Sequence, residues 1–116
     1  MDNLASKSGI SPISKPFQLI IENPHVERDM TIRFACELYC NQRNDKDAKE
    51  NGVNPLRIWE NLNYKAYDEH VVPIILNRLI AYNQREGLLT YNSVSHKVLL
   101  TTRGTAWAEK NCVGKL

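Results

Sequence analysis

The sequence predicts a mostly helical α+β fold in which three helices precede a two-stranded hairpin and a last helix follows it. Apolar residues recur at helical spacing in three stretches between residues 26 and 86. Two short segments of alternating apolar and polar residues then follow Gly87, and a capped helical segment ends the pattern. The chain has 116 residues, of which 42% are hydrophobic. That is enough for one packed domain without metal or disulfide support.

The first 16 residues predict a flexible N-terminal arm, because they are rich in Ser, Lys, Gly and Pro. The domain is therefore expected to span residues 17–116. Residues 17–21 are apolar or nearly so and predict either a short strand or a segment that packs on a neighbour. Asn23-Pro24 ends this segment, because a residue before proline favours extended geometry.

The first helix, predicted over residues 26–43, carries apolar residues on two sides. One stripe consists of Met30, Phe34 and Leu38. The second stripe consists of Ile32, Ala35, Cys36, Tyr39 and Cys40. A helix that is apolar on two sides is buried on two sides, so one stripe packs on its own domain and the other needs a partner. We expect a homodimer whose interface contains four residues of the second stripe: Ile32, Cys36, Tyr39 and Cys40.

A polar, charged segment over residues 44–52 predicts a solvated loop. A short second helix should follow, with Asn54 as its cap and Pro55 in its first turn. Leu56, Trp59 and Leu62 are expected on its inner side. Residues 63–67 predict a turn.

The third helix is predicted over residues 68–86, with Pro73 near its first turn and Gly87 as its stop. Its inner face is expected to consist of Val71, Val72, Ile75, Leu76, Leu79 and Tyr82. Its outer face should consist of His70, Ile74, Asn77, Arg78, Ala81, Gln84 and Arg85. A hairpin over residues 89–100 follows, and Thr101 caps a last helix that runs to about residue 111 with Trp107 facing inward.

The order of these elements resembles the winged helix-turn-helix superfamily, especially small prokaryotic and archaeal regulators of the MarR and PadR kind. The segments that carry the resemblance are Leu76-Asn77-Arg78-Leu79-Ile80, Gly87-Leu88-Leu89 and Leu100-Thr101-Thr102-Arg103-Gly104. They correspond to the family's L-x-x-L helix, its "GLL" entry to the wing and its "L-T-x-x-G" entry to the final helix. The resemblance covers residues 26–111, although the segment 44–52 is longer than the family's compact connections. It implies three helices, a two-stranded wing, a C-terminal helix and a role in transcription regulation.

A winged helix of this kind would bind double-stranded DNA through its third helix, which fits the major groove. The expected contacts at the start of that helix are His70, Asn77 and Arg78, with Tyr64, Lys65 and Tyr67 in the preceding turn. The hairpin tip offers Asn92, Ser93, Ser95, His96 and Lys97 to phosphates or the minor groove. The alternative is that this polar face is simply solvated, and that Asp68 and Glu69 serve to cap the helix.

Charge gives only modest support for a polyanionic partner. The formal net charge is +2. Residues 64–116 hold seven Lys/Arg and four Asp/Glu, a net +3, whereas residues 1–63 hold eight and nine, a net −1. The half that contains the third helix and the hairpin is therefore the more favourable for an anion.

Other function classes find little support in the sequence. No nucleophile elbow, phosphate loop or dinucleotide turn is present, so we expect neither an enzyme nor a cofactor. Metal ligands at paired spacing are absent, and so are a membrane span and a secretory signal. Three cysteines without framework spacing predict reduced thiols and a cytoplasmic location.

Two alternatives stay open at this point. The first is a winged-helix module that binds another protein inside a larger assembly that handles nucleic acids. The second is a metal or redox sensor built on Cys36 and Cys40, which lie one helical turn apart, with His25 or Cys112 completing the site.

Overall fold

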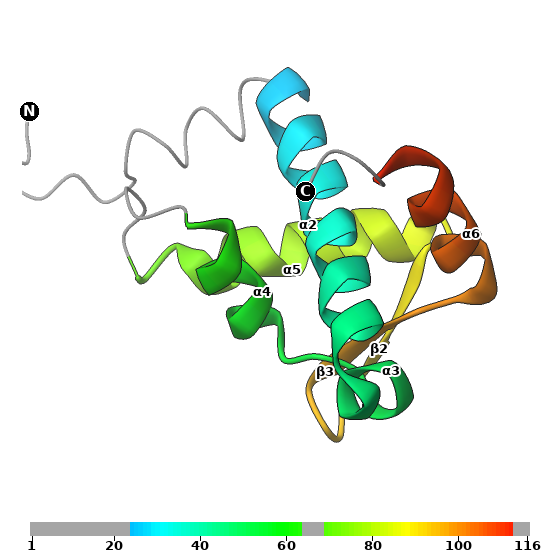
Figure 1. The fold of residues 1–116 in the computed structure, drawn as a ribbon. Helices are drawn as coiled ribbons and strands as arrows, with labels where there is room; N and C mark the ends of the chain where they lie inside the picture. The colour runs from blue at the N-terminus through cyan, green and yellow to red at the C-terminus, as the bar shows by residue number, and fades with distance from the viewer. Residues whose placement is uncertain (1–23, 64–68, 113–116) are drawn as a thin grey trace, which may run out of the picture.

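The computed structural model describes residues 24–63 and 69–112, and Figure 1 shows their arrangement. The elements in chain order are α2 (Pro24–Asn44), α3 (Lys46–Asn51), α4 (Pro55–Leu62), α5 (Val72–Arg85), β2 (Leu89–Asn92), β3 (Lys97–Leu100) and α6 (Thr102–Asn111). The predicted mostly helical α+β class is confirmed. The predicted arm and the apolar segment 17–21 lie outside the described residues. None of the described helices combines the length and the apolar character that a membrane span requires.

The main core lies where α2, α4, α5 and the hairpin meet, and α2 passes across α5 in Figure 1. The first stripe of α2 is buried as predicted, since Met30, Phe34 and Leu38 all belong to this core. The predicted inner face of α5 is also buried, except that Tyr82 is half-buried. The apolar periodicity therefore identified the faces that form the core.

The expected loop over residues 44–52 is wrong, because most of it forms α3. Asp45 caps this helix by accepting hydrogen bonds from the backbone N–H groups of Asp47 and Ala48 at 3.0 and 3.4 Å. The buried Gln42 fixes the position of α3, since its Nε2 donates to the Ala48 carbonyl at 3.1 Å and its Oε1 accepts from Leu100 N at 3.0 Å. One polar side chain thus ties α2 to α3 and to the hairpin.

Helix α4 begins as predicted, with Asn54 as its cap and Pro55 in its first turn. Trp59 and Leu62 are buried, but Leu56 is 51% exposed, so its placement on the inner side was wrong. Ile58 fills the inner position instead. The reason is geometric: residues 55, 58, 59 and 62 share one face at 100° per residue, and residue 56 lies off that face.

Helix α5 begins at Val72, four residues later than predicted, with Pro73 in its first turn. It ends at Arg85, and Gly87 has φ +76°, a left-handed conformation that glycine adopts without strain. The strands β2 and β3 pair antiparallel, from Leu89 opposite Leu100 to Asn92 opposite Lys97. Val53 extends this sheet by an isolated antiparallel bridge to Val98, with N–H···O distances of 2.8 and 2.9 Å.

Helix α6 begins as predicted, because the Thr101 hydroxyl accepts a hydrogen bond from Gly104 N at 2.9 Å. A Cβ atom at Gly104 would overlap the Leu88 carbonyl oxygen, which explains why glycine occupies this position. The helix then packs on α2 through a small second cluster, which consists of Cys36, Ala108 and Cys112 with the half-buried Tyr39 and Trp107. Within this cluster Cys36 and Cys112 form a disulfide. The predicted reduced state of these two thiols is therefore wrong.

Candidate nucleic-acid interface

The outer face of α5 holds the first group of residues that the sequence predicts to contact DNA. His70, just before the helix, and Asn77 within it are both exposed, as predicted. Ile74 lies between them and is 48% exposed. This outer face is therefore a mixed polar and apolar surface on a helix that is anchored from behind by the main core.

Arg78 lies at the edge of this surface, toward α2. Its Nε donates to Glu27 Oε2 at 2.7 Å, and its terminal nitrogen lies 2.6 Å from the same carboxylate oxygen and donates to the Tyr82 hydroxyl at 3.1 Å. The Glu27 side chain is largely buried and holds the guanidinium against α2. These contacts make Arg78 less available for a base than the sequence suggested, and Asn77 becomes the stronger candidate.

The same ion pair affects Tyr82. A hydrogen bond to Glu27 raises the pKa of the Tyr82 hydroxyl, and burial and the negative charge of Glu27 raise it further, while Arg78 and Arg85 lower it. The Arg85 guanidinium also lies over the Tyr82 ring, 4.8 Å from its centroid. Tyr82 is thus part of a polar network that joins the start of α2 to the middle of α5.

The hairpin tip holds the second group of predicted residues. Asn92 Oδ1 accepts hydrogen bonds from Val94 N at 2.8 Å and Ser95 N at 3.1 Å, so this side chain shapes the turn. His96 has φ +59°, and its Nδ1 lies 2.9 Å from the Tyr91 hydroxyl. Ser95 and His96 are exposed and Lys97 is half-buried. The tip can therefore present a hydroxyl, an imidazole and an ammonium to a phosphate.

Two features near the tip were not anticipated. Tyr91 is 36% exposed, although Val98, its partner on the other strand, is fully buried in the main core. Helix α3 packs beside β3, and a groove of about 460 Å³ runs between them with Glu50 and Lys97 in its lining. The alternation of apolar and polar residues in the strand does not show how far the core extends along the hairpin. Tyr64, Lys65 and Tyr67 lie outside the described residues.

The second stripe of α2 is covered mainly by the chain itself. Cys36 is buried by α6 and bonded to Cys112, so its assignment to a dimer interface is corrected. Ile32 is 38% exposed, and Tyr39 and Cys40 are half-buried. The sequence reasoning had not foreseen that α6 would take the place of a partner. The surface left for a second copy consists of Ile32, Tyr39 and Cys40.

The structure also bears on the sensor alternative. Cys36 pairs with Cys112 rather than with Cys40, whose Sγ accepts a hydrogen bond from Asn44 Nδ2 at 3.6 Å. Within residues 24–63 and 69–112, no group of three or more His, Cys, Asp or Glu side chains is placed to hold a metal ion.

No known protein family, curated protein or solved structure matches the chain. The functional argument therefore depends on these residues and their geometry.

Proposed function

We propose that the chain is a winged-helix protein that binds double-stranded DNA and regulates transcription without catalysing a reaction. The observation that supports this proposal most is the exposed outer face of α5, with His70, Ile74 and Asn77, on a helix whose opposite face is firmly packed. A helix anchored in this way can enter a major groove as a rigid unit.

The topology supports a winged helix in two respects. The order of three helices, a hairpin and a last helix is the expected one, with α3 as an addition between the first two. Val53, which lies between α3 and α4, forms an isolated bridge to Val98 of β3 and so adds a single residue of a third strand to the hairpin. Residues 92–96 at the hairpin tip are exposed and can serve as the wing.

The proposed DNA contacts are of two chemical kinds, contacts with bases and contacts with phosphates. Asn77 is suited to a bidentate contact with adenine, and Ile74 to an apolar contact with a thymine methyl group. Ser95, His96 and Lys97 are suited to phosphates, which fix position rather than sequence. Arg78 would have to leave Glu27 before it could contact a base.

The proposed regulator is a homodimer that works in the cytoplasm. Its interface would use Ile32, Tyr39 and Cys40, the part of the α2 stripe that α6 leaves at the surface. The Cys36–Cys112 bond is the observation that weighs against a cytoplasmic location, since cytosolic thiols are usually reduced.

The experiment is a titration of the full chain against a selected duplex and a random duplex at two salt concentrations. Affinity for both should fall as salt rises, because bound phosphates release counterions. Asn77→Ala should weaken the selected site by about 1–3 kcal/mol and flatten the preference at one base pair. Gln84→Ala, two turns further along the exposed surface of α5, is the matched control and should bind as the wild type does. Lys97→Ala should weaken all sequences alike and reduce the salt slope by about one.

A second candidate function is docking to another protein. It is favoured by the exposed Ile74 and by the lack of a Lys or Arg near the start of α5 among the described residues, where Glu69 stands instead. A wild-type chain without salt-dependent affinity for any duplex would favour this candidate. An Ile74→Ala variant that loses only a protein partner would support it directly.

A further inference from the structure

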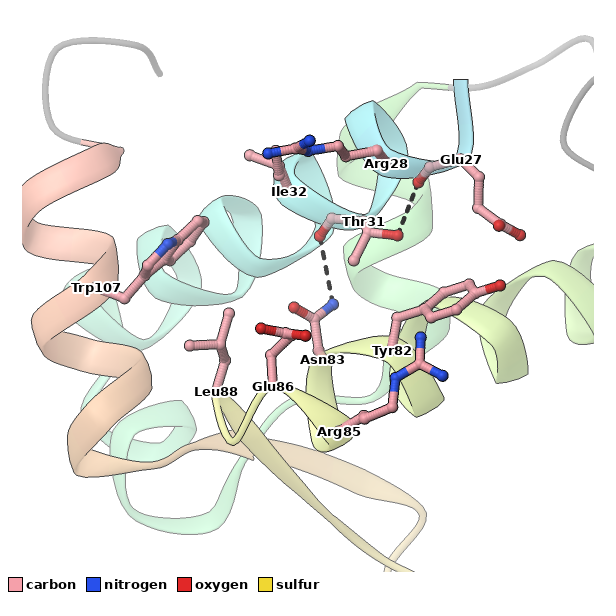
Figure 2. Close-up of a pocket in the computed structure, with 10 residues that line it drawn as sticks. All are labelled: Glu27, Arg28, Thr31, Ile32, Tyr82, Asn83, Arg85, Glu86, Leu88 and Trp107. Atoms are coloured by element: carbon pink, nitrogen blue, oxygen red, sulfur yellow. Dashed lines mark hydrogen bonds between the residues drawn. The ribbon is translucent and has the colours of Figure 1, made fainter. Parts of the chain in front are cut away.

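A pocket lies between the start of α2, the end of α5 and α6 (Figure 2). Its volume is about 380 Å³, within the range of sites for small molecules. One wall is apolar and consists of Ile32, Leu88 and Trp107. Asn83 also belongs to the lining, and Figure 2 draws it on the same side as Leu88 and Glu86. None of the residues predicted to contact DNA takes part in it, but Ile32 also belongs to the proposed dimer interface.

Asn83 carries the evidence that this pocket binds a ligand. The side chain is 1% exposed, and its Nδ2 donates to the carbonyl oxygens of Leu79 at 2.9 Å and Thr31 at 3.3 Å. Because both partners are acceptors, the nitrogen must face them and Oδ1 must turn away. In Figure 2 the oxygen lies on the side of Leu88, and it accepts no hydrogen bond from the described residues.

Burying an amide oxygen without a hydrogen-bond donor costs free energy, so a ligand that reaches this atom should supply an N–H or O–H group. The charges around the pocket indicate what else the ligand should carry. The lining holds Arg28 and Arg85 beside Glu27 and Glu86, a formal sum of zero, and Glu27 is also paired with Arg78, so a cation finds no excess of negative charge there. The Trp107 indole offers a ring face or edge for an aromatic contact.

We propose that this pocket binds a small uncharged aromatic molecule that carries one N–H or O–H donor. The donor contacts Asn83 Oδ1. The ring lies against the apolar wall of Ile32, Leu88 and Trp107. The proposal does not depend on DNA binding, because the test uses the chain without DNA.

The experiment compares indole with benzofuran, which has the same shape but an oxygen acceptor in place of the N–H donor. Each is titrated into the full-length, disulfide-bonded chain and followed by the NMR signals of the Asn83 side-chain amide and the Trp107 indole N–H. Indole should shift both signals, and benzofuran should bind at least about tenfold more weakly because it leaves Oδ1 without a donor. This comparison needs no substitution of Asn83, whose nitrogen helps to join α2 and α5.

Ile32→Ala should weaken indole about fivefold, because it removes part of the apolar wall. Leu56→Ala, an equally conservative truncation of an exposed side chain on α4, is the matched control and should leave the affinity unchanged. Equal affinities for indole and benzofuran would overturn the proposal, as would shifts confined to other residues or no binding at all. An affinity for indole that falls as the protein concentration rises would identify a second copy as the occupant and would also overturn it.

Discussion

The two apolar sides of α2 are held in different ways. The first stripe, with Phe34 at its centre, enters a main core that α4, α5 and the hairpin all share. The second stripe packs on α6 through a cluster of three buried residues and two half-buried ones, and a disulfide joins the two helices there. A broad core needs no covalent link, whereas a small one gains most from it. The comparison predicts that the two sides respond differently to truncation and to reduction.

The largest effect should come from the main core. Phe34 is fully buried, so Phe34→Ala should cost about 3–5 kcal/mol of unfolding free energy through lost burial and the cavity left behind. Urea denaturation followed by circular dichroism measures this loss. Leu56→Ala is the control, since half of that side chain is exposed, and it should change stability by no more than about 0.5 kcal/mol. Equal effects of the two variants would show that the first stripe is not the core side of α2.

A smaller and more local effect should follow from loss of the disulfide. The double variant Cys36→Ala with Cys112→Ala should lose about 2–4 kcal/mol, because the bond closes a long loop in the unfolded chain. Hydrogen exchange should show the amides of α6 losing protection before those of α5.

Cys40→Ala is the matched control for that double variant, because Cys40 is a free thiol. It should keep both the stability and the α6 protection of the wild type. Titration of thiols in the unfolded wild-type chain without reductant should find one free group. Three free groups, or a double variant as stable as the wild type, would contradict the role given to the bond.

The same contrast explains what the sequence could predict. Met30, Phe34 and Leu38 repeat at helical spacing, so the main core follows from local pattern. Cys36 and Cys112 are 76 residues apart, and nothing in their spacing shows that they meet. The second stripe was therefore recognised as buried, but its partner was taken to be another chain rather than α6.

At the candidate interface, too, local spacing predicts some residues correctly and misses others. Asn77 was placed on the outer face of α5 by its angle around the helix, and it lies there. Arg78 was placed on the same face, yet its guanidinium is held by Glu27, a residue 51 positions earlier in the chain. Helix α3 was missed because its apolar pattern is too short, and only the Asp45 cap marked its start. A contact distant in sequence therefore accounts for the difference at Arg78, whereas a short local pattern accounts for the missed α3.

The smallest effect should come from the polar edge of the main core, where Tyr82 joins the Glu27–Arg78 pair. Tyr82→Phe removes one hydroxyl and should cost about 0.5–1.5 kcal/mol at neutral pH, less than either apolar truncation in the core or loss of the disulfide.

The pH dependence of stability and of tyrosine ionisation identifies the contribution of the Tyr82 hydroxyl. The pKa of Tyr82 is raised above its ordinary value of 10.0, chiefly by the hydrogen bond to Glu27, so the folded chain keeps this proton to a higher pH than the unfolded chain does. Its contribution to stability is therefore complete below pH 10.0 and is lost as the pH rises through the folded-state pKa. Ultraviolet difference titration should show a tyrosine ionising above pH 10.0 in the wild type, and that phase should be missing in Tyr82→Phe. Glu27→Gln should move the phase toward lower pH, because it removes the negative charge that opposes ionisation. A phase that persists unchanged in both variants would place the perturbed tyrosine elsewhere and would separate Tyr82 from this network.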